Sequence, residues 1–147
     1  MAPPLRIVWL GLLVGLMGCA PRLVTPPGGS GAPAPGGAVE RFLQLAAARE
    51  YLQMGWVFGT AEGPVLHRDP APEVEQRMYA LATVLDNEGY SVGRGVAVPG
   101  RVGAAQRFDV VVRQGGAEVV VPVVTVRGGA GRWLVEQVDV QAITARR

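Results

Sequence analysis

Apolar residues first recur at helical spacing between residues 38 and 53. Val39, Phe42, Leu43 and Ala46 fall on one stripe, with polar residues between them. Such a stripe is typical of a helix that covers a core with one face. The pattern therefore predicts a helix over residues 38–53 at the start of the folded domain.

A second helical stripe follows a proline-rich loop. Val74, Met78, Leu81 and Leu85 repeat at helical spacing, and Gly89 is placed to close the helix. Between the two helices, residues 56–60 indicate a buried turn or short strand. Residues 61–64 then predict a turn, and residues 65–68 a short extended piece.

After Gly89 the pattern changes to alternation, which is typical of half-buried strands. The predicted strands cover residues 90–98, 107–113, 117–127 and 133–143. The pair Gly115-Gly116 predicts a two-residue hairpin turn. Pro122 lies inside the third strand, where it indicates an edge, a bulge or a bend.

Helices first and hairpins afterwards predict an α+β fold, with N-terminal helices packed on a curved antiparallel sheet of four or more strands. Short hairpin links argue against a parallel sheet. One domain over residues 38–144 accounts for the whole pattern.

This order resembles the NTF2-like, or SnoaL-like, cone of the cystatin-like roll class. The resemblance rests on Phe42 and Leu43 in the leading helix, residues 56–60, and the final strand opened by Trp133. It implies helices packed into the concavity of a bent sheet. Some members place Asp, Tyr or His in a pocket for isomerase or dehydratase chemistry, and others bind ligands or serve in assembly.

The N-terminus has another plan: Arg6, then an uncharged apolar run from Ile7 to Gly18, then Cys19. This is the plan of a secretory signal peptide. With Leu16 and Gly18 before Cys19, it resembles a bacterial lipoprotein signal. The resemblance implies a signal peptide over residues 1–18, cleavage before Cys19, and a diacylglyceryl group on the Cys19 sulfur that binds the membrane.

Two other interpretations of Cys19 are open: a plain signal peptide with a chance cysteine at the cut, or a buried structural cysteine. A transmembrane helix is disfavoured, because spanning a bilayer takes roughly 20 apolar residues. A lipidated Cys19 places the protein in the cell envelope, facing the periplasm. Ala20 after it implies the outer rather than the inner membrane in a cell that has both.

Residues 19–37 are rich in proline and glycine, which predicts a semi-extended tether between the lipidated cysteine and the domain. The net charge is only +2 at pH 7, so no nucleic-acid partner is expected. The chain has one histidine and one cysteine. Zinc sites use three or four ligands, so we expect no metal and no cofactor.

Six aromatic residues are candidates for lining an apolar ligand pocket, and the alternative is ordinary core packing. They are Trp56, Phe58, Tyr79, Tyr90, Phe108 and Trp133. A catalytic pocket would instead combine Tyr79 or Tyr90 with Asp86 or Asp109. His67 is the remaining acid–base candidate, although its neighbours indicate a solvated loop.

The sequence thus favours a membrane-anchored lipoprotein whose domain binds a small ligand or assembles with proteins, without catalysis. A small pocket enzyme of the isomerase or dehydratase type and a structural envelope protein are the alternatives. An exposed apolar sheet face would favour a homodimer through that face.

Overall fold

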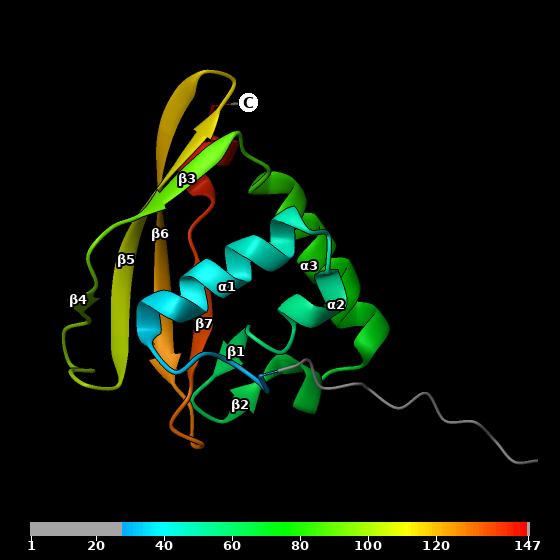
Figure 1. Cartoon of the computed structure of the whole chain (residues 1–147), viewed down its shortest axis with the longest axis vertical. Coiled ribbons are helices and arrows are strands. Elements are labelled where there is room, and N and C mark those ends of the chain that lie inside the picture. Colours follow the sequence, from blue (N-terminus) through cyan, green and yellow to red (C-terminus); the bar gives the residue numbers. More distant parts are fainter. Residues whose placement is uncertain (1–27, 147) are drawn as a thin grey trace, which may run out of the picture.

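A computed structural model of the chain describes residues 28–146. Helices lead and an antiparallel sheet follows, which confirms the α+β class (Figure 1). The helices are α1 (Pro35–Ala47), α2 (Tyr51–Met54), the 3-10 turn η1 (Val65–His67), α3 (Ala71–Val84) and α4 (Gln141–Thr144). The strands are β1 (Gly59–Thr60), β2 (Gly63–Pro64), β3 (Gly89–Val92), β4 (Val96–Ala97), β5 (Ala105–Gln114), β6 (Ala117–Arg127) and β7 (Trp133–Val138).

The main sheet has the order β3-β5-β6-β7, and β4 also pairs with β5. All of these pairs are antiparallel. Gly115 and Gly116 join β5 to β6 with φ of 57° and 76°, the left-handed backbone that a type I′ hairpin requires. The predicted hairpin is therefore confirmed.

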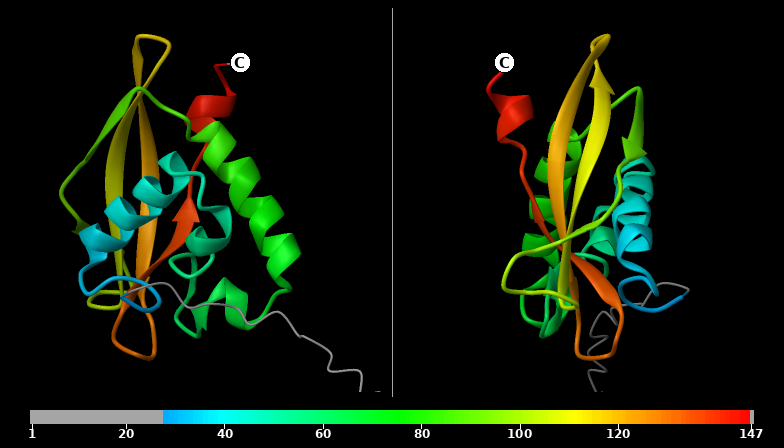
Figure 2. Two further views of the ribbon diagram at one scale, coloured as in Figure 1. Left: turned by 45° about the vertical axis from the view of Figure 1, so that its right-hand side comes forward. Right: turned by 90° about the vertical axis from the view of Figure 1, so that its left-hand side faces the viewer.

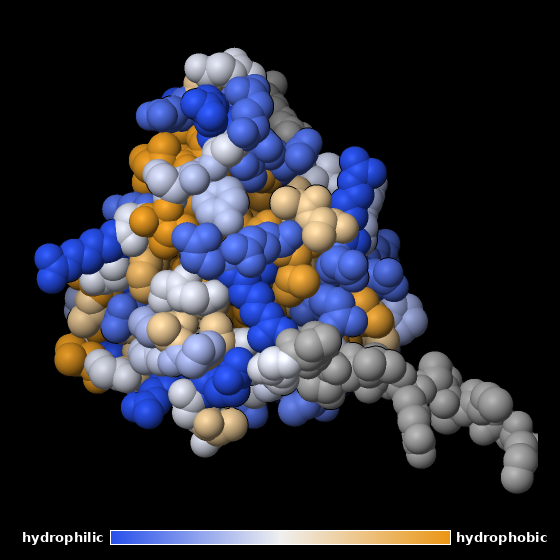
Figure 3. Space-filling view, in the orientation of Figure 1, coloured by the Kyte–Doolittle hydropathy of each residue, from blue (hydrophilic) through white to orange (hydrophobic). Residues whose placement is uncertain are grey.

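One face of the sheet is covered and the other is open. In the right-hand panel of Figure 2 the β5–β6 hairpin lies toward the viewer, with α3 behind it and α1 to its right. Helix α1 packs across β6 and β7, and α2 packs against α3. The core between the layers is formed mainly by Val39 and Phe42 of α1 and by the inward valines of β5 and β6. On the side shown in Figure 3, apolar side chains form small groups separated by polar ones.

The predicted helix over residues 38–53 is two helices, and the break lies at Arg49. Glu50 N–H donates to the Leu45 carbonyl at 2.9 Å, and Arg49 N–H donates to the Ala46 carbonyl at 3.1 Å. This pair of bonds is a Schellman motif, which ends a helix and needs a left-handed residue. Arg49 takes that place with φ of 59°.

Four other predicted bounds differ from the structure. The strand predicted over residues 90–98 is two short strands, β3 and β4, with residues 93–95 between them. Residues 65–67 form a 3-10 turn and not an extended piece, because Val65 and Leu66 are consecutive and both buried, which an alternating strand does not allow. Helix α3 ends at Val84, and Gly89 opens β3. The last strand ends at Val138, and α4 follows and buries Ile143 in the core.

Pro122 marks the place where β7 leaves β6. Its carbonyl accepts a hydrogen bond from Asp139 N–H at 2.9 Å, one residue beyond β7. In a strand, the N–H and the carbonyl of one residue point to the same side. The side of β6 on which Pro122 has no N–H to donate is therefore the side that faces the end of β7. A bulge between Val124 and Thr125 adds to the bend.

The predicted tether is wrong for its last part, since the chain is packed from Gly31 onward and α1 begins at Pro35. Gly31 N–H donates to the Trp56 carbonyl at 2.8 Å, and Ala32 exchanges two hydrogen bonds of 2.8 Å with Trp133. Gly31 has φ of 63°, and a Cβ there would lie 2.5 Å from the Trp133 carbonyl oxygen, so glycine permits this approach. Cys19 and the predicted signal peptide lie outside the described residues.

Candidate functional site

Four of the six predicted pocket aromatics are packing residues. Trp56, Phe108 and Trp133 are buried in the core, and the half-buried Phe58 packs on Phe42 with ring centroids 5.9 Å apart. The space that α1 encloses with the inward valines has no room for a water molecule. Helix and sheet therefore meet directly, and the expected internal pocket is filled by side chains.

Tyr90 lies at the sheet edge and is engaged by α1. Its hydroxyl donates to the Glu40 carboxylate at 3.0 Å. Partial burial raises the pKa of Tyr90, and the hydrogen bond and negative charge of Glu40 raise it further. Tyr90 also lines an open hollow between β3 and the β5–β6 hairpin, and its hydrogen bond to Glu40 joins β3 to α1.

The acid–base candidates lie apart. His67 packs edge-on against Trp56, with ring centroids 5.5 Å apart. Asp109 pairs with Arg107 at 2.9 Å. Among residues 28–146, no hydrogen bond joins any two of His67, Tyr79, Tyr90 and Asp109. These four residues are thus not brought together, and of the predicted tyrosine–aspartate pairs only Tyr79 and Asp86 line a common hollow.

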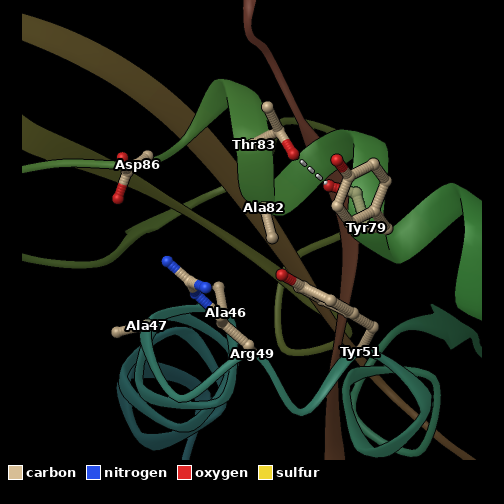
Figure 4. A pocket seen from close by; sticks show the side chains of 8 residues that line it. All are labelled: Ala46, Ala47, Arg49, Tyr51, Tyr79, Ala82, Thr83 and Asp86. Carbon is tan, nitrogen blue, oxygen red and sulfur yellow. Dashed lines mark hydrogen bonds between the residues drawn. The ribbon is translucent and has the colours of Figure 1, made fainter.

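Tyr79 lies 54% exposed on a groove between α3 and the α1–α2 corner. The central hollow of this groove has a volume of about 330 Å³. Two elements supply its polar groups: Arg49 and Tyr51 come from the corner, and Tyr79 and Asp86 come from α3 and the turn after it. Figure 4 shows the Arg49 and Asp86 side chains at one end of the hollow and the two tyrosine rings at the other.

The aromatic end is a packed pair. The rings of Tyr51 and Tyr79 lie edge to face, with centroids 5.3 Å apart and an angle of 84°. Within the described part of the chain neither hydroxyl makes a hydrogen bond. Edge-to-face packing fixes both rings, so the hydroxyls border the hollow as free donors and acceptors.

The charged end holds two opposite charges that do not pair. Among the described residues neither Arg49 nor Asp86 is in an ion pair. Thr83 lies in α3, between Tyr79 and Asp86 in the sequence. Its hydroxyl donates a hydrogen bond to the Tyr79 carbonyl at 2.8 Å. The hollow therefore has one cation and one anion available for a ligand.

The groove continues in both directions along α3. A hollow toward the start of α3 shares Tyr51 and Tyr79 with the central one and adds Pro72, Glu75 and Gln76. A hollow toward its end shares Thr83 and Asp86 and reaches Gln114 and Arg146. We call these three connected hollows the α3 groove.

Tyr79 and Asp86 were candidates from the sequence, whereas Arg49 and Tyr51 were not. The single helix predicted over residues 38–53 has no corner that would direct these two side chains toward α3. The signal available was the weakening of the apolar stripe after Ala46, where polar and small residues follow.

The chain matches no protein-family model, and comparison with the curated proteins and with the solved structures found no match. No helix within residues 28–146 is long and apolar enough to cross a membrane. The same residues contain no group of three or more His, Cys, Asp or Glu side chains placed to hold a metal ion.

Proposed function

We propose that this protein is a lipid-anchored lipoprotein of the bacterial cell envelope whose domain binds a ligand in the α3 groove without covalent chemistry. The anchor is the diacylglyceryl group on Cys19, and the domain faces the periplasm, at the outer membrane where the cell has one. The observation that supports binding is the groove, where Arg49 and Asp86 form no ion pair with any described residue.

We also propose an NTF2-like fold for the domain. What supports it is the order of two helices, a short hairpin, a third helix and then the long strands. The helices lie on one face of the sheet, as that family's cone requires (Figure 2). Fold alone does not decide function, so the binding proposal rests on the groove.

Non-catalytic binding is favoured over the isomerase-type alternative because the enclosed core is filled and the groove is open. Proton-transfer chemistry of that kind uses a positioned acid and base in a pocket that excludes water. In the α3 groove the titratable groups stand in solvent-accessible positions. The groove is better suited to holding charges than to moving protons.

Cell fractionation with intact-mass measurement tests the anchor. We expect the wild-type protein in the membrane fraction, with a chain that begins at Cys19 and carries added lipid mass. The Cys19→Ser variant should lose both the added mass and the membrane association. An unmodified wild-type protein in the soluble fraction would refute the anchor.

NMR spectroscopy of the domain tests the binding site. Amide signals are compared before and after adding a small-molecule extract of cells that make the protein. We expect shifts at Arg49, Tyr51, Tyr79 and Asp86, with β5 and β6 unchanged. Shifts confined to the open sheet face would move the site there.

That open face supports a second proposal, a homodimer. Val111, Val120, Pro122 and Val124 form an aliphatic row on the side of β5 and β6 away from the helices, and Val120 is 48% exposed. Neighbouring charges are already paired, as Arg107 with Asp109, so they do not oppose contact. Sedimentation of the wild type and Val120→Lys tests it: a dimer that the variant abolishes supports it, and a monomeric wild type rejects it.

A further inference from the structure

We propose that the α3 groove binds a free α-amino acid with an apolar side chain. The inference rests on the proposed function, because it names the ligand of the same groove. It follows from how the central hollow divides its chemistry: opposite charges lie at one end and an aromatic pair lies at the other (Figure 4).

The charged end suits an ammonium and a carboxylate on one carbon. The Arg49 guanidinium offers parallel N–H donors that match a carboxylate, and the Asp86 carboxylate accepts from an ammonium. Both groups face the hollow, and no ion pair within the described residues occupies either of them. A ligand with a single charge would leave one of the two without a partner.

The aromatic end suits an apolar side chain. Tyr51 and Tyr79 form this wall, and Ala46 and Ala82 line the hollow beside it. The edge-to-face contact holds the rings in place before any ligand arrives. An amino acid with its charged groups at Arg49 and Asp86 can therefore extend its side chain toward the tyrosines.

Backbone strain at Arg49 is a second, independent observation. The Schellman position is most often glycine, because a side chain with φ near +60° is strained. Arg49 is the one non-glycine residue with positive φ among residues 28–146. Strain of this kind is often found at functional sites. Here the strained residue places its guanidinium at the hollow. Glycine, the usual residue at this position, would place no charge there.

Calorimetry with the mature protein and L-leucine tests the inference. Two matched probes each lack one charge: 4-methylpentanoate has no ammonium, and 3-methylbutylamine has no carboxylate. We expect L-leucine to bind, and each probe to bind at least about tenfold more weakly, since each loses one charge-assisted contact.

Two variants locate the site. Arg49→Asn keeps a residue that tolerates the left-handed backbone and removes the cation, and Asp86→Asn removes the anion. Each should weaken L-leucine binding at least about tenfold. Arg107→Gln, on the open sheet face, is the matched control and should bind as the wild type does.

Three results would overturn the inference: no heat from L-leucine, equal binding of the one-charge probes, or variants that bind as well as the wild type. The NMR experiment with the cell extract separates this failure from that of the proposed function. If the extract still shifts Arg49 and Asp86, the groove binds another class of ligand. If it shifts neither, both proposals fail.

Discussion

Arg49 and Asp86 face each other across one hollow, although one ends α1 and the other follows α3. A Schellman turn directs Arg49 into the hollow, and its two backbone hydrogen bonds of 2.9 and 3.1 Å hold the corner. The strained residue of this turn, Arg49, is thus also the residue that brings a cation to the hollow.

Replacing Arg49 with glycine should therefore stabilise the domain while weakening binding. Relief of the left-handed strain contributes about 1 kcal/mol. Urea unfolding measures the gain. Arg49→Ala is the control, since it removes the side chain but keeps a Cβ at φ of 59°. A glycine variant no more stable than the alanine variant would contradict the strain argument.

Tyr90 should make stability fall at alkaline pH. Partial burial first, and then the hydrogen bond to Glu40, raise the pKa of Tyr90 above the ordinary value of about 10 for a tyrosine. Below pH 10 the phenol is protonated in both folded and unfolded chains, so its contribution is fully present. As the pH rises further the unfolded chain loses this proton first, and the contribution disappears once the pH passes the folded pKa.

Ultraviolet titration of tyrosine ionisation checks this directly. The wild type should show one phenol that ionises later than the others, and Tyr90→Phe should remove it. Glu40→Gln should bring the late phenol to lower pH, because the carboxylate charge is gone. A late phenol that persists in Tyr90→Phe would assign the shift to another tyrosine.

Truncation before Ala38 should cost at least about 3 kcal/mol of unfolding free energy relative to a chain that begins at Gly28, because it also removes the start of α1 and carbonyls that accept from Arg41 and Arg132. The shorter chain loses the three backbone hydrogen bonds of Gly31 and Ala32, and each contributes on the order of 1 kcal/mol. Thermal or urea unfolding of the two chains measures the difference. Equal stability would mean that the packed segment contributes nothing.

The pair of Arg101 with Glu136 should hold the loop before β5 against β7. Two hydrogen bonds of 2.7 and 2.9 Å join the two side chains. Glu136→Gln should speed hydrogen exchange at the amide of Ala105, which bonds to the Arg101 carbonyl at 2.9 Å. Asp109→Asn breaks a pair within one strand and is the control. Unchanged exchange in Glu136→Gln would show that the loop does not depend on the pair.

Much of the fold could be predicted because its patterns are local. The stripe of Val74 and Met78 predicted α3, and alternation about Phe108 and Val110 predicted β5. The glycines at 115 and 116 predicted their turn. In each case neighbouring residues decide which face is buried, so no knowledge of distant contacts was needed.

The predictions that were wrong or incomplete, for the tether, the end of α1 and the groove, have a common physical cause. Each of these features depends on contacts between segments that are distant in the sequence. Ala32 pairs with Trp133 through backbone atoms, and composition says nothing of such pairing. Arg49 takes a conformation typical of glycine, so the end of α1 carried no usual signal. The groove then depends on how α1 and α3 are placed relative to one another, which periodicity does not specify.

Native mass spectrometry of the protein, released from membranes in mild detergent, tests the central claim that the anchored domain binds a ligand in the α3 groove. We predict a lipidated chain beginning at Cys19 that carries a non-covalent small molecule. Arg49→Asn should lose this molecule, and Arg107→Gln should keep it. A lipidated wild type with no bound molecule, or one retained equally by Arg49→Asn, would contradict the claim.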